Sequence, residues 1–111
     1  MRKFGRKRGQ RRAFIKGLAH NLITKEKIET TVARAKEIRP AVERLVTTAK
    51  KQQLASLRSL LAKLPKDSAQ KLFYEIAPRY KDTKGGYLRI IKKAASRKRD
   101  GASLATIEFV K

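Results

Sequence analysis

Residues 28–50 read IETTVARAKEIRPAVERLVTTAK, a short β-branched run followed by a long helical pattern. The run over residues 27–31 predicts a strand that ends at a helix N-cap. Beyond it, apolar residues recur at helical spacing to about residue 50. They are Ala35, Ile38, Val42, Leu45, Val46 and Ala49. Pro40 interrupts this pattern without changing its phase, so we expect a kink or a brief break and then continuation of the helix.

On the N-terminal side of this stretch, the sequence predicts a helix over residues 11–24. Apolar residues spaced by four form its buried stripe. They are Phe14, Leu18 and Leu22, together with Ile15, Ala19 and Ile23. The first ten residues, MRKFGRKRGQ, hold five basic residues, two glycines and little that could be buried. They predict a flexible basic arm.

On the C-terminal side, two shorter helices are expected. Leucines at helical spacing predict the first, which Pro65 ends; they are Leu54, Leu57, Leu61 and Leu64. The second begins at residues 67–70, a capping-box-like start, and continues to Pro78. Its apolar face consists of Ala69, Leu72, Phe73 and Ile76.

The last third of the chain predicts two strands. Residues 79–86 form a loop with a Gly85-Gly86 turn, and strands follow over 87–93 and 104–110, joined by the basic connection 94–102. Because these strands are close in sequence, an antiparallel hairpin is expected. The fold class is therefore α+β, with four helices packed on a small three-stranded mixed sheet and a basic N-terminal arm. Residues 11–111 are expected to form one domain.

The charge of the chain points to a polyanionic partner. It carries 30 Lys and Arg against 9 Asp and Glu, a formal net charge of +21 over 111 residues. Residues 1–25 hold nine basic residues and no acidic one, and residues 79–100 hold nine basic and two acidic residues. Self-repulsion of this size destabilises a compact chain unless something neutralises it.

The composition argues against several other kinds of site. The chain has no cysteine and one histidine, so a disulfide framework or a transition-metal site is not expected. No apolar run is long enough to span a membrane, and no cofactor motif is present. His20 has no companion for a catalytic triad, which leaves it a structural or RNA-contacting residue. Glu26 and Glu29 are better explained as charge balance than as an acid/base pair, so no enzyme and no small-molecule substrate are expected.

Two basic patches are the strongest physical signal. The first comprises Arg2, Lys3, Arg6, Lys7, Arg8, Arg11 and Arg12, with Lys16 facing outward beyond it. The second comprises Arg89, Lys92, Lys93, Arg97, Lys98 and Arg99. Arginine binds phosphate bidentately and lysine acts as a point charge, so both patches suit a nucleic-acid backbone. Charge alone gives no base specificity. For Tyr80 and Tyr87, packing in the core is favoured over stacking on bases.

Alternative functions remain open on composition alone. A DNA-compacting protein would have the same charge, with comparable affinity for duplex DNA and structured RNA. A membrane-surface binder would need a basic amphipathic helix with bulky apolar anchors, and the chain has no tryptophan. For both basic patches, a solubilising or edge-protecting role is the simpler alternative.

Specific motifs resemble a known family. Residues 28–50 contain Ile-x-Thr-Thr, then Arg-Ala-Lys, and then Glu-x-Leu-Val-Thr-x-Ala-Lys after six further residues. Later matches are Leu72-Phe73, Ala77-Pro78-Arg79-Tyr80, Gly85-Gly86-Tyr87-x-Arg89-Ile90 and Ile107-Glu108-Phe109-Val110. This pattern resembles the bacterial-type large-subunit ribosomal protein family numbered seventeen, over nearly all of residues 5–111. The opening departs from the Met-Arg-His-Arg start that is usual in the family.

The resemblance implies a structural constituent of the large ribosomal subunit, in the cytoplasm or in an organelle. It implies large-subunit rRNA and neighbouring ribosomal proteins as partners, with no membrane. It also adds three residues of the long helix to the expected rRNA contacts, namely Arg34, Lys36 and Arg39. The alternative for these three is an ordinary solvated helix surface.

Overall fold

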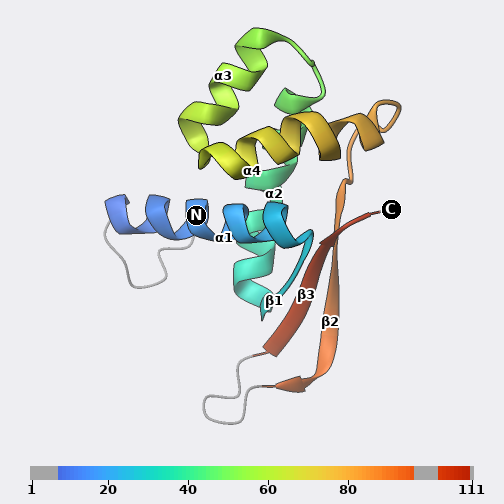
Figure 1. The fold of residues 1–111 in the computed structure, drawn as a ribbon. Helices are drawn as coiled ribbons and strands as arrows, with labels where there is room; N and C mark the ends of the chain where they lie inside the picture. The colour runs from blue at the N-terminus through green and yellow to red at the C-terminus, as the bar shows by residue number, and fades with distance from the viewer. Residues whose placement is uncertain (1–7, 97–102, 111) are drawn as a thin grey trace.

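The computed structural model describes residues 8–96 and 103–110, with side chains over 12–93 and 103–110. Its helices are α1 (Arg8–Lys25), α2 (Val32–Ala49), α3 (Leu54–Lys63) and α4 (Lys66–Lys71). A π-helical turn (Leu72–Ile76) and a 3-10 turn (Ala77–Tyr80) continue directly from α4. The strands are β1 (Lys27–Thr31), β2 (Leu88–Ser96) and β3 (Ser103–Phe109), which confirms the α+β class with four α-helices (Figure 1).

The three strands form an antiparallel sheet in the order β1-β3-β2. The prediction of a mixed sheet is wrong. β1 and β2 do run in the same direction, but the hairpin places β3 between them, so no parallel pair forms. The register aligns Ile28, Ile107 and Ile90 across the three strands. This row faces the helices, and Ile107 at its centre is fully buried.

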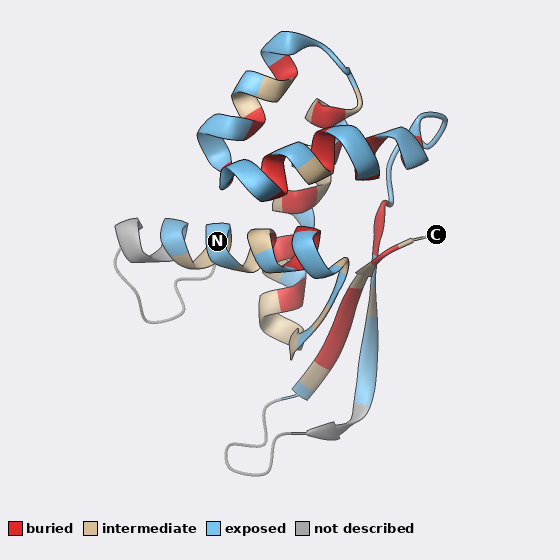
Figure 2. Cartoon of the chain, viewed as in Figure 1, coloured by how far each residue is buried: buried red, intermediate tan, exposed pale blue. Residues whose placement is uncertain are grey.

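The long helix α2 organises the core. It packs against all three strands, and it continues through Pro40 with no break. Thr31 caps its N-terminus, where the Thr31 hydroxyl accepts a hydrogen bond from the Arg34 backbone N–H (3.2 Å). The face of α2 toward the sheet and the other helices is buried at Ala35, Ile38, Val42, Val46 and Ala49 (Figure 2). Leu45, expected on this buried stripe, is only partly buried and lies at its edge.

Several helix predictions need correction. In α3, Leu54 is 63% exposed and Leu61 is 41% exposed, whereas Leu60 is buried. This helix packs mainly on α2 and α4, and its far side stays open to solvent. The N-cap of α4 is Pro65, with no side-chain capping bond, so the predicted capping-box start at residues 67–70 is wrong.

Two boundaries also differ from expectation. Helix α1 begins at Arg8, so residues 8–10, predicted in the arm, are helical. Arginine and glutamine are good helix formers, and periodicity alone locates the first apolar turn rather than the helix start. Strand β2 extends to Ser96, through residues expected in the connection, with a register irregularity after Lys92. Residues 1–7, 97–102 and 111 lie outside the described residues.

Candidate nucleic-acid interface

Two exposed cations lie one turn apart on α1. Arg12 and Lys16 point into solvent from the helix that packs against α2 and α4. Neither side chain makes a hydrogen bond or an ion pair with another residue of the described part of the chain. Unpaired cations at i and i+4 on a rigid helix can contact two phosphates without first releasing a carboxylate.

The three cations expected on α2 have three different environments. The Arg34 guanidinium lies over the Phe14 ring of α1, 5.1 Å from its centroid, in a cation–π arrangement. Lys36 is exposed and has no polar partner among the described side chains. Arg39 donates from Nε to Glu43 Oε1 (3.3 Å), an i,i+4 ion pair. Of the three, Lys36 is therefore the one whose charge is available without rearrangement.

The β2 cations are largely neutralised by carboxylates of the same sheet. Arg89 stands directly opposite Glu108 in the β2–β3 register, and its Nε donates to Glu108 Oε1 at 2.7 Å. Lys93 forms an ion pair with Glu29 of β1, across β3. Lys92 is exposed and lacks such a partner within the described ranges. Of the three β2 cations predicted to bind rRNA, two thus have a carboxylate bound.

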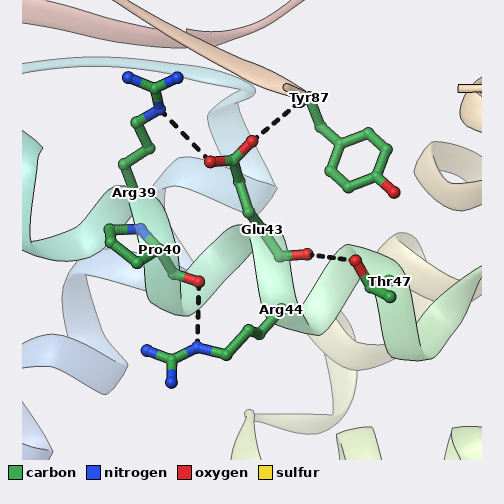
Figure 3. A network of polar contacts seen from close by, with 6 residues as sticks. All are labelled: Arg39, Pro40, Glu43, Arg44, Thr47 and Tyr87. Carbon is green, nitrogen blue, oxygen red and sulfur yellow. Dashed lines mark hydrogen bonds and ion pairs between the residues drawn. The ribbon is translucent and has the colours of Figure 1, made fainter. Parts of the chain in front are cut away.

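The Glu43 carboxylate of α2 is held in a partly buried polar network. The Glu43 carboxylate accepts from Arg39 through Oε1 and from the Tyr87 backbone N–H through Oε2 (3.0 Å) (Figure 3). Lys50 donates to the Tyr87 hydroxyl (3.0 Å). Tyr80 and Tyr87 are both buried, which confirms their packing role and removes them as a stacking surface. Burial raises the pKa of Tyr80.

Glu26 holds two more cations at the end of α1. Its backbone adopts a left-handed conformation (φ 64°), and its carboxylate forms ion pairs with Arg79 and Lys71. The hydrogen bond from Arg79 lowers the pKa of Glu26, with a smaller contribution from Lys71, against the opposing effect of burial. Arg79 and Lys71 therefore serve the fold, joining the end of α1 to the turns that follow α4.

Two cations missed by sequence reasoning accompany Arg12 and Lys16. Arg44 and Lys63 approach the same side of the molecule from α2 and from the end of α3. Arg44 leaves α2 on the side away from Arg39 and Glu43, with its Nε bound to the Pro40 carbonyl (3.3 Å) (Figure 3). The Lys63 side chain has no hydrogen bond or ion pair to any described residue. Counting charge by segment hid both, because residues 26–78 hold six acidic residues beside eleven basic ones and so stand out less than the two basic patches.

The remaining predicted contacts have no described side chain. Arg8 and Arg11 lie in α1 by their backbone only. Outside the described residues are Arg2, Lys3, Arg6, Lys7, Arg97, Lys98 and Arg99. His20 is partly buried, and its Nδ1 has no hydrogen-bond partner in the described part of the chain.

A search of the described residues finds no cluster of three or more His, Cys, Asp or Glu side chains that could hold a metal ion. Among the same residues, no helix has the length and apolar character needed to cross a bilayer.

Comparison with known proteins agrees with the motifs. A sequence profile of the family described as Ribosomal protein L17 matches residues 14–110. The chain belongs to this family. It is 49% identical to the large ribosomal subunit protein bL17 of Staphylococcus carnosus, over 98% of both chains. It is also 49% identical to the bL17 protein of Thermodesulfovibrio yellowstonii, over 98% of this chain and 82% of the relative. The Fusobacterium nucleatum protein is 48% identical over 98% and 94%, respectively. The resemblance drawn from the motifs is thus confirmed.

Proposed function

We propose that this chain is a structural constituent of the large ribosomal subunit and binds large-subunit rRNA mainly through phosphate contacts. Membership of the L17 family is the observation that carries the proposal, since the relatives are named as large-subunit proteins. The net charge of +21 supplies the attraction. On the folded part of the chain, the proposed phosphate contacts are Arg12, Lys16 and Lys36, which form no ion pair with a described residue.

Three regions contribute to the proposed interface. The α1 cations and Lys36 contact phosphates directly. The arm over residues 1–10 and the basic connection after β2 add contacts through their arginines and lysines. Arg39, Arg89 and Lys93 contribute less, because each must first leave a glutamate. We assign no enzymatic role, and we place the protein on ribosomes beside neighbouring large-subunit proteins.

A salt titration of rRNA binding tests the proposal. If about half of the seventeen proposed cations contact phosphate, the slope of log affinity against log salt is expected to be on the order of −6 to −8. The probe is transcribed large-subunit rRNA of Staphylococcus carnosus, measured by filter binding. A slope near −1 would contradict phosphate-dominated binding. Comparable affinity for duplex DNA of equal length would favour the alternative, a non-specific DNA-compacting protein.

A further inference from the structure

A groove with an apolar floor opens between α1, α2 and the end of α3. Its volume is about 390 Å³, within the range of pockets that take a small organic ligand. The floor consists of Ile15, Ala19, Ala41, Leu45 and Leu64. Ile15 and Leu45 pack against the core from its edge, and each keeps part of its side chain exposed to the groove. At Ile15, Ala41 and Leu45 the floor is thus apolar surface that the fold leaves partly uncovered, whereas Ala19 and Leu64 are buried.

The rim of this groove is strongly positive. Four cations from three helices surround the floor, namely Arg12, Lys16, Arg44 and Lys63, against the single carboxylate of Glu37. None of the four forms an ion pair with a described carboxylate. This differs from the sheet side, where Glu29 and Glu108 neutralise Lys93 and Arg89. An occupant that suits this groove has an apolar or π-bonded body and negative charges on both of its flanks.

Resting on the proposed rRNA binding, we propose that the groove takes one unpaired nucleotide of that RNA. The base lies on the aliphatic floor, and the phosphates on its two sides lie on the cationic rim. A base extruded from a helix or loop is flat and apolar on its faces and is flanked by one phosphate on each side. Proteins bind such bases against apolar side chains and the planes of arginine guanidinium groups. Arg12 and Arg44 supply two such planes.

An apolar peptide with acidic flanks is the other chemistry that could fill the groove. The whole chain is strongly cationic, and two of the rim cations, Arg12 and Lys16, belong to the basic first half of α1. An RNA strand that follows α1 brings phosphates to the rim along the same path, whereas a peptide needs acidic residues on both sides of one apolar side chain. The nucleotide is therefore the occupant that the charge favours.

Filling the groove without changing its charge tests the proposal. Ala41→Phe places an aromatic ring on the floor, and Thr48→Phe places one in the groove from about two turns farther along α2. Ala55→Phe is the matched control, because Ala55 is exposed on α3 and does not line the groove. Thermal unfolding checks that each variant is folded. Binding to the Staphylococcus carnosus large-subunit rRNA is measured by salt titration, with chemical probing of unpaired bases.

The expected result is that both groove variants bind this rRNA at least about tenfold more weakly, as when one stacked base is lost. Their salt slope stays that of the native protein, because the phosphate contacts remain. One base that the native protein protects becomes reactive with both groove variants and stays protected with Ala55→Phe.

Unchanged affinity and an unchanged footprint in a folded groove variant would overturn the proposal. So would normal rRNA binding combined with loss of a crosslink from the groove to a neighbouring protein in assembled subunits, which would indicate a peptide occupant. If the native protein itself fails to bind the rRNA, the proposed function fails first, and the two failures are thereby distinguished.

Discussion

The cations of α1 and those of β2 differ in what neutralises them. Arg12 and Lys16 form no ion pair with a described carboxylate, whereas Arg89 and Lys93 each hold a glutamate of the same sheet. The antiparallel register causes this difference. It sets Arg89 opposite Glu108, and it places Glu29 on the neighbouring edge strand β1, where Lys93 reaches it across β3. Opposite charges across a sheet stabilise the pairing of strands. A basic segment therefore need not be a binding surface, because part of its charge can belong to the fold.

Apolar residues of the sheet and of the groove differ in burial, and this difference gives the largest expected effect on stability. Ile107 is fully buried at the centre of the sheet, whereas Leu45 is only partly buried and lines the groove floor. Ile107→Ala is expected to lower the free energy of unfolding by about 2–5 kcal/mol. Leu45→Ala is expected to cost about 1 kcal/mol, because only part of its surface is buried. Urea unfolding of both variants measures the difference, and equal losses would contradict the assignment of Leu45 to the groove.

Removing charge from the two regions is expected to have unequal effects on rRNA binding. Arg12→Ala with Lys16→Ala should reduce the salt slope by about 2, one for each lost phosphate contact. Arg89→Ala with Lys93→Ala should reduce it by less than about 1, since these cations are already paired. Filter binding over a range of salt concentrations gives both slopes. A larger loss from the β2 variant would reverse the proposed order of the two surfaces.

A companion variant sharpens this test by freeing charge instead of removing it. Glu29→Gln with Glu108→Gln releases Lys93 and Arg89 while keeping side chains of the same size. Affinity for rRNA should then rise and the salt slope should steepen. No change would mean that the β2 cations do not face the RNA at all.

Much of this fold follows from local sequence pattern. Strand alternation predicted the hairpin, and helical spacing predicted α2 and α3. The placement of β3 between β1 and β2 did not follow, because strand order depends on contacts between distant residues. The same limit applies to α3, where Leu60 and Leu61 are equivalent in sequence and only packing on α2 and α4 buries Leu60.

The candidate interface was less predictable, for a related reason. Sequence identifies which residues are basic, but the Arg89–Glu108 pair joins residues 19 positions apart, and the Lys93–Glu29 pair joins residues 64 apart. Arg44 and Lys63 reach the rim of the groove only because α2 and α3 fold beside α1. Whether a cation is free is thus a tertiary property, and segment counts of charge do not contain it.

The smallest effect is expected where cations are held most closely by the fold. Glu26 binds Arg79 and Lys71, and its pKa lies below the ordinary value of 4.5. A lowered folded pKa means that this carboxylate stabilises the fold fully above about pH 4.5, and that the contribution fades as pH falls through the lowered value.

Glu26→Gln keeps a similar side chain at the left-handed backbone position and removes the charge. At pH 7 it should lower the free energy of unfolding by about 0.5–1 kcal/mol, as expected for a partly exposed ion-pair network. Unfolding measured from pH 7 down to pH 3 should show the native and variant proteins converging as Glu26 is protonated. A difference that stayed constant to the lowest pH would show that the amide disturbs packing, and that the Glu26 charge is not what holds Arg79 and Lys71.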